Sequence, residues 1–247
     1  MFPKKFDRYI EPFLGSGAVF FHLCPSRAIL GDTNEDLIQT YVAIRENWQL
    51  VHRYLREHQN YHDKDYYYQV RASAPRSLAS RAARFIYLNR TCWNGLYRVN
   101  LDGQFNVPIG TKTRVLTEED CFASISDTLR GADLRAVDFE DLIDRSGKGD
   151  FVFVDPPYTV RHNHNAFIKY NERLFSWFDQ LRLFQSLRRA RNRGATIIGT
   201  NALHDCVLEM YSGEFETWAV ERNSLISSKP DGRRSCDELL FHTGDLS

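Results

Sequence analysis

The segment FVFVDPPYTV, residues 151–160, decides the fold because a strand and a rigid turn meet in it. Its first four residues are apolar and mostly β-branched or aromatic, which is typical of a buried strand. The strand then runs into an acid, two prolines and a tyrosine. A core strand that ends in a carboxylate indicates a sheet with ligand-binding groups at its strand ends.

Strand-like and helix-like stretches alternate along most of the chain. The alternation predicts an α/β fold with a mainly parallel sheet covered on both faces. Strands are expected at 8–13, 27–32, 132–139, 150–154 and 195–200, then near 215–220 and 237–242. Helices are expected at 35–58, 117–129 and 174–193, with a further helical zone at 64–90 that Pro75 interrupts. Three strands end in EPFLGSG, GD and DPPY, so acids and glycines gather at the carboxyl edge, where such sheets bind ligands.

One stretch, residues 55–130, interrupts this alternation and is predicted to be an inserted, mainly helical lobe. Within it, NGLYRVNLDGQFNVPIG (94–110) has the alternation of a β-hairpin, with Asp102-Gly103 at its turn. We therefore predict one domain from residues 1–54 and 131–247 and a second from the inserted lobe.

Composition narrows the class of protein further. The chain has 247 residues, 43% of them hydrophobic, and a formal net charge of zero. It has no apolar run of the roughly 18 residues that cross a bilayer, so no membrane partner is expected. Its five cysteines are scattered without CxxC spacing, which favours reduced thiols in a cytoplasmic protein.

The glycine turn GSG, residues 15–17, lies between a predicted strand and a predicted helix. Glycines let the backbone approach a ligand, and Asp32 at the next strand end can accept hydrogen bonds from ribose hydroxyls. A steric turn and a helix cap are the alternatives for these residues. No GxxxxGK[ST] or complete GxGxxG motif follows, so the pattern favours a nucleoside without a pyrophosphate. S-adenosylmethionine is the natural candidate.

The DPPY turn suits an amine on a flat ring. Such an amine develops positive charge when it accepts a methyl group, and two aimed acceptors stabilise that charge. Asp155 supplies a carboxylate, and Pro156 supplies a carbonyl whose direction Pro157 restricts. Tyr158 offers an aromatic face for the base. The alternative is an ordinary strand-to-helix turn with a capping aspartate.

Basic residues are concentrated in one segment of this neutral chain. Residues 66–101 contain no acid and six arginines, interleaved with aromatic residues. This favours binding to double-stranded DNA, with a solvated helix face as the alternative. A second run, Arg182, Arg188, Arg189, Arg191 and Arg193, is interpreted as solvated surface.

Two polar loops complete the candidate regions. His162 and His164 in the loop 159–171 have no third ligand at suitable spacing, so no metal is expected. We expect this loop to close over the base, and the loop 225–234 to touch the DNA backbone.

Taken together, these motifs resemble the Dam-type (D12 class) DNA adenine-N6 methyltransferases over nearly the whole chain. EPFLGSGAVF is similar to the family's cofactor motif, GDTNEDLI to its second strand and acid, and VDPPY to its catalytic motif. FIYLNRTCWNGLYRVNLDGQFNVPIG is similar to its DNA-contacting lobe, and SLISSKPDGRRSCDELL to its C-terminal segment.

The resemblance implies a Rossmann-like S-adenosylmethionine methyltransferase sheet, a DNA-recognition lobe and a monomer that methylates a flipped adenine in GATC. It implies catalytic roles for Asp155, Pro156, Pro157 and Tyr158, and it makes Tyr170 a candidate for enclosing the base. It places the cofactor at Glu11, Pro12, Phe13, Gly15, Gly17, Asp32, Asp138 and Phe139. It places DNA at Arg90, Trp93, Asn94, Leu96, Arg98 and Asn100, with Arg98 suited to guanine and Trp93 to the gap left by the base.

The chain departs from the family at its beginning, where relatives usually carry a lysine-rich Gly-Gly-Lys segment that clamps the cofactor. Only MFPKKFDRY precedes IEPF, so weaker cofactor affinity and looser site recognition are expected. The alternatives are a catalytically impaired DNA-binding homologue, or methylation of another amine such as cytosine N4 or a protein glutamine. A role in restriction-modification is compatible with the family.

Overall fold

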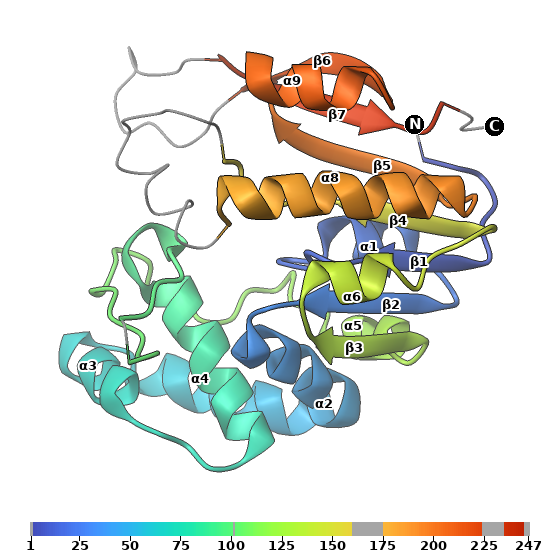
Figure 1. Cartoon of the computed structure of the whole chain (residues 1–247). Helices are drawn as coiled ribbons and strands as arrows, with labels where there is room; N and C mark the ends of the chain where they lie inside the picture. The colour runs from blue at the N-terminus through green and yellow to red at the C-terminus, as the bar shows by residue number, and fades with distance from the viewer. Residues whose placement is uncertain (1, 101, 160–174, 224–234, 245–247) are drawn as a thin grey trace. The chain divides into compact units, whose positions relative to one another are not determined.

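The computed structural model describes residues 2–100, 102–159, 175–223 and 235–244 (Figure 1). Tyr170, the two loop histidines and the polar loop 225–234 lie outside the described residues. The chain divides into two compact units. Unit 1 comprises Met1–Phe20, Pro25–Thr33 and Val137–Ser247, and unit 2 comprises Phe21–Cys24 and Asn34–Ala136.

A seven-stranded sheet in the order β3-β2-β1-β4-β5-β7-β6 confirms the predicted α/β fold. Its strands are β1 (Arg8–Glu11), β2 (Ala28–Asp32), β3 (Ala132–Ala136), β4 (Asp150–Val154), β5 (Thr196–Ala202), β6 (Glu216–Asn223) and β7 (Ser235–His242). Strand β1 pairs in parallel with β2 and β4, and β4 pairs in parallel with β5. The two late strands pair antiparallel, with β7 beside β5.

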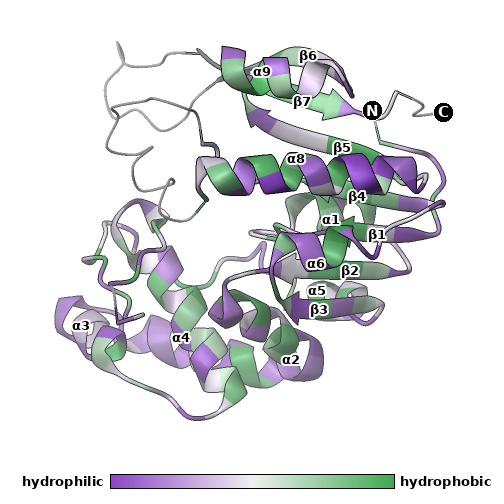
Figure 2. Ribbon diagram, viewed as in Figure 1, coloured by the Kyte–Doolittle hydropathy of each residue, from purple (hydrophilic) through white to green (hydrophobic). Residues whose placement is uncertain are grey.

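Strand β4 lies in the middle of the sheet, and all five of its residues are buried. This fits an apolar strand that is covered on both faces. Outside the segment Asn34–Ala136, the described residues form the helices α1 (Ala18–Leu23), α6 (Phe139–Ile143), α8 (Trp177–Asn192) and α9 (Asp205–Ser212). Helix α8 begins at a capping box formed by Ser176 and Asp179. Apolar and polar residues alternate along α8 in Figure 2, and its buried Leu183 and Leu187 join the core beside Val152.

Unit 2 is mainly helical, as predicted for the inserted lobe. It contains α2 (Glu35–Tyr61), α3 (Lys64–Ala72), α4 (Leu78–Thr91), the 3-10 turn η1 (Trp93–Gly95) and α5 (Phe122–Leu129). The predicted helical zone 64–90 is two helices, α3 and α4, which are interrupted around Pro75 as expected. Unit 2 starts before the predicted residue 55 because α2, which is kinked at Asn47, packs against α4 and α5.

The predicted hairpin is present as two isolated antiparallel bridges, Cys92 with Ile109 and Val99 with Phe105. Its turn is at Asp102-Gly103, as expected, and Gly103 has a φ of +74°, which glycine adopts without strain. No helix in the described part of the chain is both long and apolar enough to cross a membrane.

Candidate active site and nucleic-acid interface

The DPPY carboxylate lies beside a threonine of the neighbouring strand. Val154 of β4 pairs with Gly199 of β5, so the next residues, Asp155 and Thr200, are neighbours at the carboxyl edge. The Thr200 hydroxyl donates a hydrogen bond of 2.6 Å from Oγ1 to Oδ1 of Asp155. Sequence reasoning missed Thr200. The only available signal was a hydroxyl residue at the end of ATIIGT, and register is not readable from sequence.

The third member of this group is Tyr158, whose side chain is half-buried. Both Thr200 and Asp155 lie close enough to affect the pKa of its hydroxyl. Burial, and then the charge of Asp155, raise the pKa of this hydroxyl well above its usual value, so it stays protonated at neutral pH. Sequence reasoning assigned only the ring face of Tyr158, whereas the structure also places its hydroxyl at the carboxylate.

A second carboxyl group, Glu11, lies at the end of β1 and is only 3% exposed. It accepts a hydrogen bond of 2.9 Å at Oε2 from the Tyr9 hydroxyl. Burial raises the pKa of Glu11 to about 8, against the hydrogen bond from Tyr9, and the charge of Asp155 adds to the rise. Among the described residues, neither Glu11 nor Asp155 forms a salt bridge. Glu11 is therefore mostly protonated at neutral pH in this structure, and a positively charged ligand group at this edge would favour its ionised form.

The glycine turn is tied to the end of β2. The amide of Gly15 donates to Oδ2 of Asp32 at 3.1 Å. Gly15 and Gly17 have φ of +46° and +65°, values that favour glycine. The turn and the acid that the sequence singled out are thus in direct contact.

The remaining predicted cofactor residues lie on or next to a pair of stacked aromatic rings. Phe13 and Phe139 stack with ring centroids 5.3 Å apart, and Pro12 before them is buried. The Asp138 carboxylate caps α6 by accepting from the amide of Glu140 at 3.0 Å. It also accepts a hydrogen bond from Arg182 at 2.7 Å. The structure brings Phe13, Asp138 and Phe139 together, but the Asp138 side chain already has protein partners.

In unit 2, the segment predicted to contact bases presents exposed apolar side chains. Trp93 is 54% exposed and Leu96 is 37% exposed. Asn94 between them has a φ of +53°, in the left-handed region where asparagine is tolerated. The turn is anchored by the Trp93 amide, which donates to the Pro108 carbonyl at 2.9 Å.

The guanidinium of Arg98 forms a hydrogen bond to a described residue through Nε only. Its Nε donates to Oδ1 of Asn106 at 2.8 Å. Its two terminal nitrogens have no hydrogen bond to a described residue. A guanidinium fixed at Nε with its fork open has the geometry that reads guanine. Asn106 is a second residue that sequence reasoning missed, since nothing in NVPIG signals a partner for Arg98.

Two other residues predicted to contact DNA, Arg90 and Asn100, have side-chain hydrogen-bond partners within unit 2. Arg90 forms a bidentate ion pair with Asp120, with both N–O distances 2.6 Å. The Asn100 side chain accepts from the amides of Asp102 and Gln104 and so holds the hairpin turn. In this structure, both side chains hold neighbouring parts of unit 2 in place.

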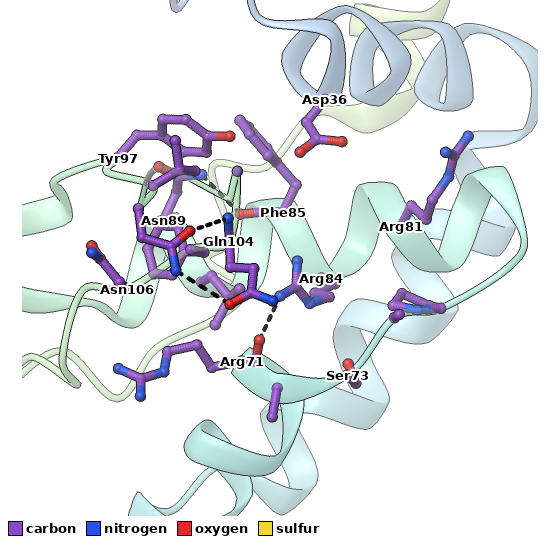
Figure 3. Close-up of a pocket in the computed structure, with 18 residues that line it drawn as sticks. Asp36, Arg71, Ser73, Arg81, Arg84, Phe85, Asn89, Tyr97, Gln104 and Asn106 are labelled. Atoms are coloured by element: carbon purple, nitrogen blue, oxygen red, sulfur yellow. Dashed lines mark hydrogen bonds between the residues drawn. The ribbon is translucent and has the colours of Figure 1, made fainter.

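A cavity of about 630 Å³ opens in unit 2 and is lined by the α3–α4 loop, α4 and the hairpin (Figure 3). Three arginines line it: Arg71, Arg81 and Arg84. Arg84 donates to the carbonyls of Val70 at 2.9 Å and Arg71 at 2.6 Å, and burial lowers its pKa from the usual value. Arg81 is exposed and has no hydrogen bond to a described residue. The cavity therefore has an excess of positive charge.

The arginine run of α8 lies at the surface, as the sequence suggested, and its side chains are paired with acids. Arg182 pairs with Asp138, Glu140 and Asp179, and Arg189 pairs with Glu140 and Asp144. Apart from Asp179 of α8 itself, these acids lie on α6 or at its two ends. In the described part of the chain, no cluster of histidine, cysteine or acidic side chains is arranged to hold a metal.

A mainly parallel sheet with a glycine turn, an acid and a DPPY carboxylate along one edge defines a Rossmann-like methyltransferase. The model of the D12 class N6 adenine-specific DNA methyltransferase family matches residues 1–225. The chain belongs to this family.

Curated relatives agree with this assignment. The type II methyltransferase M1.LlaDCHI of Lactococcus lactis subsp. cremoris is 32% identical over 97% of this chain and 87% of its own length. The type II methyltransferase M.MjaIII of Methanocaldococcus jannaschii is 33% identical over 92% of this chain and 84% of its own length. DNA adenine methylase of Salmonella typhi is 32% identical over 96% of this chain and 86% of its own length. The chain is an adenine-N6 DNA methyltransferase, and its class implies S-adenosylmethionine as the methyl donor.

Proposed function

We propose that this enzyme binds S-adenosylmethionine at the carboxyl edge of unit 1 and methylates an adenine that is flipped out of GATC. The observation that carries the proposal is the position of Asp155 directly after β4, beside the parallel strand β1, which ends at Glu11. Both acids lack a salt-bridge partner among the described residues, so the edge suits a sulfonium and an ammonium group. When bound, the cofactor supplies an electrophilic methyl group.

The other residues of this edge fit the nucleoside part of the cofactor. Asp32, tied to the Gly15 amide, is the acceptor for the ribose hydroxyls. Phe13 and Phe139 provide an apolar aromatic face for the adenine ring. Because Arg182 holds the Asp138 carboxylate, the backbone beside Asp138 is the part that contacts the adenine.

The target base is proposed to enter as an extrahelical nucleotide, at a cost of roughly a few kcal/mol. The Asp155 carboxylate and the Pro156 carbonyl accept the two N–H bonds of N6, and Pro157 fixes the direction of that carbonyl. These acceptors stabilise the positive charge that develops on N6. Tyr158 lies at the carboxylate and supplies the adjoining aromatic surface.

DNA is proposed to bind unit 2 through the segment Trp93–Asn100. The open fork of Arg98 reads a guanine of GATC, and the exposed Trp93 occupies the gap left by the flipped base. Asn94 and Leu96 contact the neighbouring bases, whereas Arg90 and Asn100 hold the segment in shape. The cavity with Arg81 and Arg84 accepts the phosphate backbone.

The proposal is tested by incubating the protein with S-adenosylmethionine and duplexes that contain or lack GATC. The products are digested to nucleosides and N6-methyladenine is measured by mass spectrometry. Methylation is expected only in the GATC duplex. Asp155→Ala is expected to abolish it while the affinity for DNA stays within about threefold, since Asp155 lies in unit 1.

Each contrary result rejects a different part of the proposal. Equal methylation of a duplex without GATC would reject the recognition sequence. N6-methylation by Asp155→Ala at the wild-type rate would reject the role of the DPPY carboxylate. Calorimetry that shows no cofactor binding, with DNA binding retained, would favour the catalytically impaired homologue.

A further inference from the structure

We propose that Thr200 is a positioning residue for the methylation reaction, because it fixes the carboxylate of Asp155. The inference rests on the proposed role of Asp155 as an acceptor for the target amine. Thr200 lies in β5, outside the DPPY motif. Its assignment comes from the 2.6 Å hydrogen bond between its hydroxyl and Oδ1 of Asp155.

The backbone around Thr200 is tightly fixed. Gly199 lies so close to its neighbours that a Cβ there would come within 2.3 Å of the Phe241 ring and 2.5 Å of Val154 Cγ2. Strand β5 is thus pinned between β4 and β7 at this point, and Asn201 on the other side of Thr200 is fully buried. The hydroxyl of Thr200 is therefore held by a rigid part of the sheet.

The partner carboxylate is not held in this way. Asp155 is exposed and follows the last residue of β4, where no ladder restrains it. A short carboxylate in that position can rotate away from the incoming amine. A hydrogen bond to a charged group has a strong directional preference, so one donor on a rigid strand is enough to select one orientation.

The hydroxyl of Thr200 also gives the two carboxylate oxygens of Asp155 different hydrogen-bond partners. A carboxylate only accepts hydrogen bonds, so the Thr200 proton is directed at Oδ1. We assign the other oxygen to the N6 amine of the target. Loss of the threonine hydroxyl would therefore free the carboxylate to turn both of its oxygens away from the target amine.

The test compares Thr200→Val, which keeps the shape and removes the hydroxyl, with Thr200→Ser, which keeps the hydroxyl. The single-turnover rate of methylation is expected to fall about 10- to 100-fold in Thr200→Val and to recover to within about threefold in Thr200→Ser. The affinities for S-adenosylmethionine and for DNA are expected to stay unchanged. Thr196→Val, at the start of the same strand, is the matched control and should retain the wild-type rate.

The inference is overturned if Thr200→Val methylates at the wild-type rate, or if Thr200→Ser is as slow as Thr200→Val. If Thr200→Val lowers the midpoint of urea unfolding, Thr200→Ala gives the rate instead, because it removes the same hydroxyl without a new methyl group. The variant Asp155→Ala separates the two proposals. Loss of activity in Asp155→Ala with a normal Thr200→Val defeats this inference alone, whereas an active Asp155→Ala defeats the proposed role of the carboxylate.

Discussion

Two arginine-rich regions of this protein look alike in sequence and differ in their partners. In α8 of unit 1, every arginine of the run forms an ion pair. Arg182 and Arg189 bind the acids on and around α6, Arg193 approaches Asp144 at 3.8 Å, and Arg188 and Arg191 bind Glu214. The positive charge of this helix is therefore compensated within unit 1.

The arginines between residues 66 and 101 of unit 2 have different partners. Arg71 and Arg84 donate to backbone carbonyls, and Arg98 donates to an amide oxygen. Only Arg90 has a salt bridge in the part of the chain that the structure describes. Because a carbonyl satisfies a donor without cancelling its charge, this region stays basic.

The comparison shows that the number of arginines in a segment does not predict a binding surface. The two runs have five and six arginines, and the sequence around both is rich in apolar residues. What separates them is whether acids from other elements fold against them. A region whose charge stays uncompensated attracts a polyanion, which supports the proposal that unit 2 binds DNA.

The largest effect is expected from Arg98→Lys, which removes the guanidinium fork but keeps the charge. The ratio of kcat/KM between GATC duplexes and duplexes with the guanine replaced should fall about 10- to 100-fold, because a bidentate base contact is worth about 1–3 kcal/mol. Arg90→Lys is the control. Its fork is bound to Asp120, so it should lower the unfolding free energy and leave the base preference unchanged. A changed preference in Arg90→Lys alone would reverse the two assignments.

A smaller effect, on stability, is expected from Arg182→Gln in the compensated run. Hydrogen bonds from Arg189 and Arg182 lower the pKa of Glu140, and bonds from Ser176 and Arg182 lower the pKa of Asp179 although burial opposes them. Loss of Arg182 should lower the unfolding free energy at pH 7 by about 1–2 kcal/mol.

The pH dependence of this loss has a definite sign. Acids with a lowered pKa stabilise the fold above their ordinary value, near 4, and lose this effect as the pH falls through the lowered pKa. The difference in unfolding free energy between wild type and Arg182→Gln, measured by urea denaturation, should therefore shrink below about pH 4. A difference that grows in acid would contradict the ion-pair assignment.

The smallest effect is expected from Arg81→Gln, which removes one uncompensated charge at the cavity of unit 2. DNA affinity should fall by a few-fold for all sequences alike, and the slope of log K against log salt should decrease by about 1. The matched control is Arg135→Gln, whose charge is already paired with Asp133 at 2.6 Å. If both variants change the salt slope equally, the distinction between compensated and uncompensated arginines does not predict DNA binding.

The sequence predicted the features that depend on neighbouring residues. The apolar run 150–154 gave a strand with every residue buried, and Asp102-Gly103 gave the hairpin turn with its positive φ. The glycine turn and Asp32 were predicted to share a site, and the Gly15 amide does contact that carboxylate. Local sequence suffices here because strand patterning and turn chemistry act over a few residues.

The partners of the key side chains were decided by tertiary structure. Thr200 reaches Asp155 across 45 positions of sequence, because the parallel register of β4 and β5 aligns Val154 with Gly199. The acids that neutralise α8 also come from other elements. A sequence specifies which residues can form strands, helices and charges. Which of these charges and hydroxyls find partners depends on the register and packing of distant segments, and these are set only when the whole core forms.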